Sequence, residues 1–497
     1  MDVLKQYVDS FNQNDNELYK NEIDNDHALA WLREEIPIFE CPDKELEKTY
    51  YFRWWTYRKH LKKTEDGYVI TEFLPTVPWS GKYNVINAAA GHHLAEGRWL
   101  KNAKTYLTDY IRFYLNHSED SHRYSTWLVT AILDFYRVVG EIPKDKELVK
   151  ALCVYFEEWE QTHQLPNGMF WSYDDRDAME YSISGTKDLQ CRKGIRPTLN
   201  SYLCADAEAL AILADYANMP DVAETYRNKH ERLKKQILEN LWDRDFFKAF
   251  HYDSETWSTA FDGDKNNIPR ELIGYIPWCF DIPKKDQAAA FSYLENPEGF
   301  YTEFGLTTAE QSDPRFLYEV DHECLWNGYI WPFATSQTLT ALNNLCRKQP
   351  TDENRQLFCK LLRQYAVSHS ITMEDGTVLP WIDEVKHPHR DEWSSRSLLK
   401  DWGWKKDLGG EERGKDYNHS TFCDLVICGI AGVDPKAETF TVQPNIPEDW
   451  DYMKLSNLHF RGNCYTVIYD KTGEKYGVEK GIVVLKEGQS TEHLGAC

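Results

Sequence analysis

The sequence predicts a helical toroid, a closed ring of helical hairpins, with a small antiparallel β appendage at its C-terminal end. Three observations support this fold class. Apolar residues recur at helical spacing through most of the chain, long loops rich in Trp, Gly, Pro and Asp separate pairs of these helices, and strict alternation replaces helical spacing near the C-terminus. A ring of hairpins fits because short turns can close one end while the long loops build a site at the other.

Helices are expected where apolar residues recur at i, i+3, i+4 and i+7 over ten or more positions. The predicted helices span residues 99–117, 124–140, 146–163, 200–218, 222–242, 334–348 and 353–369. The long loops span residues 72–84, 165–185, 322–332 and 378–393. We expect these loops to supply the functional residues, because loops held by a rigid scaffold commonly carry binding and catalysis.

The two ends of the chain differ from this helical region. Residues 1–45 are polar and weakly periodic, so we interpret them as an N-terminal arm or lead-in helix. From about Glu438, segments such as YMKLSNLHFRG and CYTVIYDKTG alternate apolar and polar residues between turn signals, which is typical of antiparallel strands. We therefore expect an arm (1–45), a helical barrel (46–437) and a β-rich appendage (438–497).

Charge and composition narrow the function. The formal net charge is −23, which disfavours nucleic acid and anionic membrane surfaces, since both require a basic face on the protein. The chain has 18 Trp and 30 Tyr, more bulky aromatic residues than an average core needs. Aromatic rings pack against the C–H faces of sugars, so a carbohydrate site is one interpretation, and a helical core with bulky fillers is the other.

The N-terminal residues and the cysteines indicate the compartment. The first 26 residues have no basic region followed by an apolar one, and no run approaches 18 apolar residues, so we expect neither a signal peptide nor a membrane span. The 12 cysteines include no C-x-x-C pair, which favours free thiols over disulfides or zinc. These features predict a cytoplasmic protein, unless an export signal has been removed from this chain.

The most acidic long loop is the first candidate for catalysis. Its segment WSYDDRDAMEYS, residues 171–182, carries three aspartates and a glutamate within seven residues. Crowding of like charges raises at least one pKa, as a general acid requires. A solvated acidic turn is disfavoured by the neighbouring aromatic residues. A calcium loop is disfavoured because the glycine and closing glutamate of an EF-hand are missing.

Two later loops carry further carboxylates. The segment PWIDEVKHP contains Asp383 and Glu384, and the segment EERGKDYNHS contains Glu412 and Asp416. Glycoside hydrolysis needs one carboxyl group to protonate the leaving oxygen and a second to act as nucleophile or to activate water. The two groups must face each other across one pocket. The residues alone leave the choice of partners open, because each later pair is also consistent with a surface turn.

Four segments, taken in order, resemble glycoside hydrolase family 63, whose members include α-glucosidases and mannosylglycerate or glucosylglycerate hydrolases. DAMEYS is similar to the family's S-G-x-D-N-S-P element, LNSYL to the helix that follows it, WNGYIWP to W-R-G-P-V-W-P, and WIDEVKHP to P-I-N-E-N-Y-N-P. The resemblance covers roughly residues 50–435. It departs from the family at Ala178, which replaces an Asn, and in lacking the Ser-Pro pair. The resemblance implies an (α/α)6 barrel, a toroid of six hairpins.

The resemblance also implies a catalytic pair. It assigns Asp177 as the general acid and Glu384 as the general base of an inverting mechanism. In such a mechanism the two carboxyl groups lie about 6.5–9.5 Å apart, with a water between them. Asp416 and Glu412 stay as alternative bases, since the segment DYN also resembles the family's E-N-Y-N core. This chemistry requires no metal and no organic cofactor.

Aromatic and polar residues of the loops are candidate sugar ligands. The substrate-binding candidates are Arg53, Trp54, Trp79, Gly81, His92, Trp171, Tyr173, Tyr181, Asn200, Trp326, Gly328, Trp331 and His419. Core packing is the alternative interpretation for Arg53 and Trp54. A buried structural role is the alternative for His92 and His419.

The sequence therefore predicts an exo-acting, inverting glycosidase that cleaves an α-linked short oligosaccharide or glycoside. A pocket closed by long loops favours attack at a chain end. A non-catalytic carbohydrate-binding toroid and a polysaccharide lyase or epimerase on the same fold are the alternatives. A lyase acts on acidic uronates, so a strongly basic pocket would favour it. The expected partner is a small carbohydrate, and neither nucleic acid nor a membrane.

Overall fold

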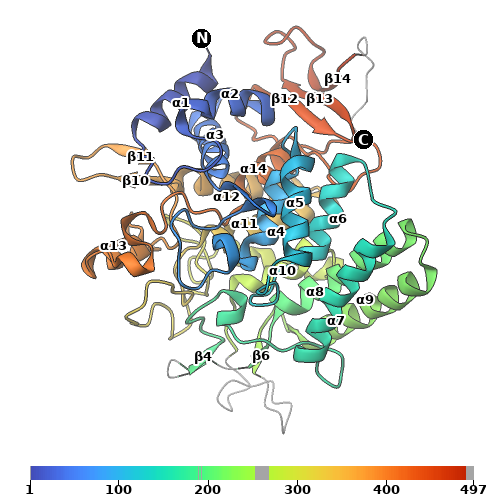
Figure 1. The fold of residues 1–497 in the computed structure, drawn as a ribbon. Coiled ribbons are helices and arrows are strands. Elements are labelled where there is room, and N and C mark those ends of the chain that lie inside the picture. Colours follow the sequence, from blue (N-terminus) through green and yellow to red (C-terminus); the bar gives the residue numbers. More distant parts are fainter. Residues whose placement is uncertain (1, 188–189, 192, 252–267, 489–497) are drawn as a thin grey trace.

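A computed structural model describes residues 2–187, 190–191, 193–251 and 268–488 (Figure 1). All seven predicted helices are confirmed, with boundaries within a few residues of those expected. The helices are α1 (Val3–Gln13), α2 (Asn25–Glu35), α3 (Lys44–Lys59), α4 (Ala90–Gly97), α5 (Ala103–Asn116), α6 (Leu128–Val139), α7 (Lys146–His163), α8 (Pro197–Tyr216), α9 (Pro220–Asn240), α10 (Ile276–Cys279), α11 (Pro332–Lys348), α12 (Asp352–Ser368), α13 (Ser394–Asp401) and α14 (Phe422–Leu425).

Local sequence signals explain where many helices begin and end. The side chains of Asp43, Asp145 and Thr351 accept hydrogen bonds from the first free backbone N–H groups of α3, α7 and α12. Proline at the first helical position begins α8, α9 and α11, where its missing N–H costs nothing. Gly140 ends α6 in the left-handed region, at φ 84°.

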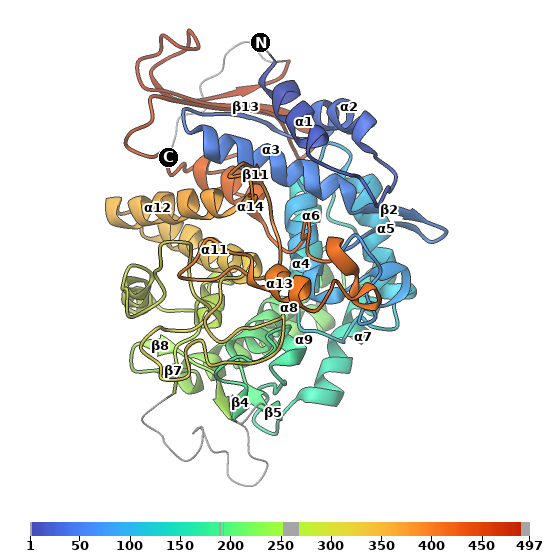
Figure 2. The same cartoon turned by 90° about the vertical axis from the view of Figure 1, so that its left-hand side faces the viewer.

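The helices form a closed sequence of contacts. Helix α4 packs on α6, α6 on α8, α8 on α10, α10 on α11, α11 on α14, and α14 again on α4. Helices α5, α7, α9, α12 and α3 each pack against a member of this series. Helix α9 lies at the edge of the molecule in Figure 1, and α12 lies at its edge in Figure 2. Burial agrees with this division. Most residues of α8 are buried on all sides, whereas α9 buries a single stripe of residues: Ala223, Tyr226, His230, Leu233 and Ile237.

A small antiparallel sheet lies near the C-terminal end, as predicted, with strand order β1-β12-β13-β14. Its first strand comes from the N-terminal segment, which the sequence did not predict. The strands are β1 (Ile38–Glu40), β2 (Leu61–Thr64), β3 (Gly67–Ile70), β4 (Thr186–Lys187), β5 (Gln190–Cys191), β6 (Gly194–Ile195), β7 (Trp242–Asp243), β8 (Phe246–Phe247), β9 (Phe250–His251), β10 (Ser370–Thr372), β11 (Val378–Pro380), β12 (Tyr452–Phe460), β13 (Asn463–Asp470) and β14 (Gly481–Lys486). The shorter strands form isolated two-stranded pairs.

The N-terminal segment is packed against the helical body. Its helix α1 contacts α3, and Asp15 just after α1 forms ion pairs with Lys59 at 3.0 Å and Lys415 at 2.9 Å. Lys59 in turn pairs with Asp416. The segment therefore holds α3 and the 411–419 loop together. The boundaries of the arm, barrel and appendage stay predictions.

Two general expectations concern thiols and membranes. The cysteines whose side chains are described are free thiols, and most are buried. In the described part of the chain, every helix is too short or too polar to cross a bilayer.

Candidate active site

The long loops meet around a cavity of about 230 Å³. All four predicted loops contribute to its wall, together with the 411–419 segment. The lining residues are Glu72, Phe73, Trp79, Ile86, Ala88, Tyr124, Ala178, Glu180, His322, Glu323, Cys324, Trp331, Glu384, Arg413, Tyr417 and His419. The wall thus combines aromatic rings with carboxyl groups, the combination that a sugar-cleaving pocket requires.

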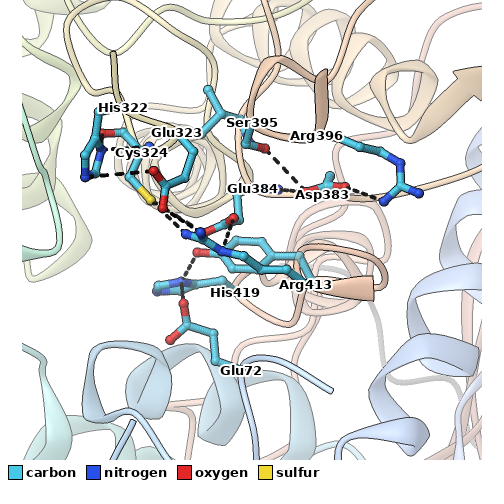
Figure 3. A network of polar contacts seen from close by, with 12 residues as sticks. Glu72, His322, Glu323, Cys324, Asp383, Glu384, Ser395, Arg396, Arg413 and His419 are labelled. Atoms are coloured by element: carbon cyan, nitrogen blue, oxygen red, sulfur yellow. Dashed lines mark hydrogen bonds and ion pairs between the residues drawn. The ribbon is translucent and has the colours of Figure 1, made fainter. Parts of the chain in front are cut away.

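Glu384 is buried in this wall, and its loop is fixed on both sides. Ile330 and Lys386 exchange two backbone hydrogen bonds of 2.9 Å, which join the 378–393 loop to the 322–332 loop. The backbone N–H of Glu384 donates to Asp383 Oδ1 at 2.9 Å. Figure 3 shows Asp383 held in turn by Ser395 and Arg396. The carboxyl group of Glu384 is therefore presented by a rigid support rather than by a free loop.

Arg413 lies against Glu384 in the cavity (Figure 3). Its Nε is 3.3 Å from Glu384 Oε2, its Nη1 donates to Glu323 Oε1 at 2.5 Å, and its guanidinium stacks on the Trp79 ring at 4.4 Å. The next residue, Gly414, allows this segment to lie close to the 378–393 loop, because a Cβ at position 414 would lie 1.8 Å from Asp383 Oδ1. The guanidinium is thus shared between two carboxylates.

The electrostatics of Glu384 suit a group that loses its proton near neutral pH. Burial raises its pKa to about 7, Arg413 opposes that rise, and the neighbouring carboxylates Asp383, Glu323 and Glu72 add to it. Its Oε2 is buried and has no aligned hydrogen-bond donor among the described residues. An acceptor of this kind is available to a water or a substrate hydroxyl.

Glu180 lines the same cavity from the 165–185 loop. Two residues of this loop, Ala178 and Tyr181, have left-handed backbone conformations with φ of 56° and 59°, which reverse the chain on either side of Glu180. The backbone N–H of Trp326 donates to the Glu180 carbonyl at 3.1 Å. Burial, together with smaller contributions from Asp174, Asp175 and Glu384, raises the pKa of Glu180 to about 8. Burial is therefore the larger cause at Glu180, and acidic crowding is a smaller one.

Asp177, the residue expected as the acid, lies outside the cavity wall. Its carboxylate accepts hydrogen bonds from Arg196 Nε at 2.5 Å and Ser125 Oγ at 2.6 Å, and also from Thr198 and Ser172. The side chain is buried within this set of donors. The ion pair ties the loop to the start of α8. The geometry therefore favours Glu180 over Asp177 as the proton donor.

The alternative bases also lie away from the cavity wall. Asp416 pairs with Lys59 beneath the N-terminal segment, and Glu412 pairs with Lys415 at 3.1 Å. Of the three base candidates, Glu384 alone lines the cavity. Its role as base stays a prediction that this geometry favours.

A second polar group of the cavity comprises Glu72, Tyr417 and His419. Figure 3 shows Glu72 and His419 side by side. His419 Nδ1 lies 2.9 Å from Glu72 Oε1 and close to the Tyr417 hydroxyl. Burial raises the pKa of Glu72 to about 8 and lowers the pKa of His419 well below its ordinary value. At neutral pH this group is close to electrically neutral, and it presents hydrogen-bonding atoms rather than charge.

The expected sugar ligands divide by position. Trp79, Trp331 and His419 line the cavity, and Tyr181 packs its ring against His322, which lines it, at a centroid distance of 4.8 Å. His92 lines a separate cavity of about 270 Å³ among the helices. The centroids of the His92 and His419 rings lie 5.1 Å apart.

The remaining candidates lie elsewhere. Those that are buried in packing or hydrogen-bonded to the backbone are Arg53, Trp54, Asn200 and Trp326. Trp171 and Tyr173 pack on each other beside Lys193. At Gly81 a Cβ would meet Asp120, and at Gly328, with φ of 126°, a Cβ would meet the Phe316 ring. These two glycines serve the backbone rather than the cavity.

Several lining residues were not identified from the sequence as candidates: Glu72, Glu180, His322, Glu323, Cys324, Arg413 and Tyr417. Glu180 and Glu72 lie in loops that the sequence did single out. Arg413 and Glu323 are 90 residues apart, and no local pattern connects them.

Comparisons with known proteins identify relatives of this chain. Residues 82–420 match the family model described as the mannosylglycerate hydrolase MGH1-like glycoside hydrolase domain, and residues 433–486 match the C-terminal domain of glycosyl hydrolase family 65. A solved structure named sialidase is 35% identical, with a TM-score of 0.86, and the match covers 98% of this chain and 43% of that one. The chain thus spans less than half of that protein's length.

Two more distant structures show the fold alone. The α-L-rhamnosidase of Streptomyces avermitilis, solved with L-rhamnose, is 10% identical with a TM-score of 0.54, over 90% of this chain and 37% of that one. An uncharacterised conserved protein of Thermus thermophilus is 14% identical with a TM-score of 0.50, over 75% of this chain and 99% of that one.

Proposed function

The chain belongs to the family of MGH1-like glycoside hydrolase domains, and on this premise we propose that its cavity cleaves a glycosidic bond with Glu180 as general acid and Glu384 as general base. One observation carries the assignment. The two carboxyl groups come from different loops, line one cavity, and interact electrostatically with raised pKa values of about 8 and about 7. Groups that titrate near the working pH are the most effective acid and base.

In the proposed reaction Glu180 protonates the glycosidic oxygen as the bond to the anomeric carbon breaks. Glu384 accepts a proton from a water that attacks the opposite face of the sugar, so the anomeric configuration inverts. Arg413 supports this role, because a guanidinium beside Glu384 favours its charged form. The acidic neighbours of Glu180 favour its uncharged form, so they keep its proton in place until it is transferred.

We further propose that α4, α6, α8, α10, α11 and α14 form the inner ring of an (α/α)6 toroid, since their contacts return to α4. The cavity volume of about 230 Å³ is below the range of roughly 300–1,000 Å³ of most small-molecule pockets. That size supports an exo-acting enzyme on short substrates. A lyase is disfavoured, because carboxyl groups outnumber lysines and arginines among the described residues that line the cavity.

Turnover of a glycoside panel tests the proposal. We expect hydrolysis of at least one neutral α- or β-glycoside. Proton NMR in the first minutes should show release of the sugar with its anomeric configuration inverted. Retention of the anomeric configuration would contradict the water-activating role of Glu384. If no glycoside of the panel is turned over, the alternative function of a non-catalytic carbohydrate-binding protein would be favoured.

The pH dependence follows from the two raised pKa values. Glu384 must be ionised, so kcat/KM should rise with pH through about 7, and Glu180 must be protonated, so kcat/KM should fall above about 8. We expect a narrow, bell-shaped dependence of kcat/KM on pH with its maximum between these two pKa values. The measurement runs from pH 5 to 10 on a neutral aryl glycoside. A maximum near pH 5 would contradict the assignment.

A further inference from the structure

A second cavity, of about 270 Å³, lies among the helices and shares no lining residue with the cavity of about 230 Å³ that the long loops build. We call the first the helix cavity and the second the loop cavity. Helices α4, α6, α10, α11 and α14, five of the six whose contacts return to α4, contribute to the wall of the helix cavity. The proposed reaction uses none of these side chains. The helix cavity is the larger of the two, so it has room for a ligand of monosaccharide size.

The two cavities lie one beyond the other along the same segments. Trp331, directly before α11, lines the loop cavity, whereas the helix cavity is lined from Gln337 to Lys348 of that helix. At a rise of about 1.5 Å per residue, these positions lie roughly 9–25 Å further along α11. His419 and Asp424 repeat the order at the start of α14. The helix cavity is therefore deeper among the helices than the proposed catalytic groups.

A layer of aromatic rings separates the two cavities. His92 lines the helix cavity, and His419 lines the loop cavity. The ring centroids of Phe333, Trp127 and His419 lie 4.4, 4.8 and 5.1 Å from that of His92. A ligand in one cavity is thus held apart from a ligand in the other.

The wall of the helix cavity combines aromatic rings with uncharged polar side chains. Trp127 and Phe280 are both partly exposed, and their ring centroids lie 6.3 Å apart. The amide and hydroxyl side chains of the wall are Thr130, Gln337, Thr340, Asn343, Asn344 and Thr421. Aromatic faces pack on C–H groups, and amides and hydroxyls exchange hydrogen bonds with the hydroxyl groups of a ligand. The combination suits a polyhydroxylated molecule.

Two lining side chains keep buried nitrogens without a partner. Both ring nitrogens of His92 and the Nε of Arg98 have no aligned hydrogen-bond partner among the described residues. His92 is 1% exposed and Arg98 is 7% exposed. Burial holds His92 neutral, with its pKa well below the ordinary value, so one ring nitrogen donates and the other accepts. A hydroxyl group can do both, and pairing such atoms removes the cost of leaving them unpaired.

The charges of the wall cancel. Among the described lining residues, four lysines or arginines face four aspartates. Arg98 pairs with Asp424 at 2.6 Å, and the exposed Lys348 pairs with Asp281 at 2.8 Å where the cavity opens to solvent. Arg347 donates to two backbone carbonyls at 2.6 and 2.7 Å. The wall has no net formal charge, which suits an uncharged ligand.

We propose that the helix cavity is a second binding site, which takes a neutral polyhydroxylated molecule such as a monosaccharide or a sugar alcohol. The inference goes beyond the proposed function and does not depend on it, since no step of the proposed reaction takes place in this cavity. The aromatic rings bind the carbon skeleton, and the unpaired nitrogens and amides bind its hydroxyl groups.

Each cavity contains a cysteine that reports on its occupancy. Cys279 lines the helix cavity and Cys324 lines the loop cavity, and both are free and partly exposed. The full chain is alkylated with N-ethylmaleimide, alone and with saturating glucose, galactose, mannose, rhamnose, sorbitol or inorganic phosphate. Peptide mass spectrometry follows each thiol separately. We expect at least one of the sugars or sorbitol to slow the alkylation of Cys279 several-fold, and phosphate to leave it unchanged.

Three variants locate the effect. Phe280→Ala removes one aromatic face of the helix cavity, so the protecting compound should be needed at a several-fold higher concentration. Thr340→Trp fills the helix cavity, so calorimetry should show the loss of one binding event, and this keeps the test valid if Phe280→Ala does not fold. Trp79→Ala is the matched control, because it alters an aromatic face of the loop cavity alone and should leave the protection of Cys279 unchanged.

Three outcomes would overturn the inference. The first is unchanged alkylation of Cys279 with every sugar and with sorbitol. The second is protection by phosphate alone, which would make the cavity an anion site. The third is protection that disappears in Trp79→Ala, which would place the ligand in the loop cavity. The presence or absence of glycoside turnover decides only the proposed function, so the two results are separable.

Discussion

Glu180→Gln is expected to lower kcat by about 10²–10⁴-fold on a glycoside with an unactivated leaving group, because the amide cannot protonate the departing oxygen. The loss should shrink on an aryl glycoside whose phenol is acidic enough to leave without a proton. Steady-state kinetics on both substrates measure the difference. The alkaline limb of the pH profile should disappear in the same variant, since it reports the ionisation of Glu180.

Asp177→Asn is the matched control, three residues away in the same loop. It removes the carboxylate that balances buried Arg196, so we expect it to lower the free energy of unfolding by about 3–5 kcal/mol, measured by denaturant titration. The folded fraction should keep most of its activity. If folded Asp177→Asn is inactive while Glu180→Gln is active, the acid is Asp177, as the family resemblance implies.

Glu384→Gln is expected to lower kcat by a similar factor of about 10²–10⁴ on both activated and unactivated glycosides. Water must be deprotonated whatever the leaving group is, so an acidic phenol should not restore the rate. This contrast with Glu180→Gln separates the base from the acid by kinetics alone. The amide keeps the size of the side chain, so the melting temperature should change little.

Asp416→Asn and Glu412→Gln are the controls for the base. Both residues lie outside the cavity wall, paired with Lys59 and Lys415, so we expect kcat of the folded variants to stay within a few-fold of the unmodified protein. Asp416→Asn should lower stability, because it leaves buried Lys59 with Asp15 alone. Loss of activity in folded Asp416→Asn with retention in Glu384→Gln would move the base to Asp416.

The fold was largely readable from the sequence because its signals are local. Helices such as α7 and α9 repeat their apolar residues with the helical period and begin at a capping Asp or a proline. The C-terminal strands alternate, and their turns contain glycine. Each of these patterns spans fewer than about 25 residues, so it can be recognised without knowing which distant segments pack against it.

The pairing of β1 with the C-terminal sheet could not be predicted from the sequence, because it depends on a distant segment. Its three residues pair with β12, more than 400 positions later, with Ile38 opposite Ser456. A strand this short carries no periodic signal of its own.

The sequence by itself determined the helical architecture, the terminal strands, the loops that build the site, and Glu384 as a candidate that lines it. Only the tertiary structure decided which side chains of those loops face the cavity. Asp177 and Glu180 share one acidic segment, but left-handed residues at 178 and 181 turn the chain so that one carboxylate meets Arg196 and the other the cavity. Trp54 and Trp79 are the same residue type, yet one is buried in the core and the other stacks on Arg413. Composition and spacing describe neighbours along the chain, whereas burial, pKa and charge pairing depend on neighbours in space.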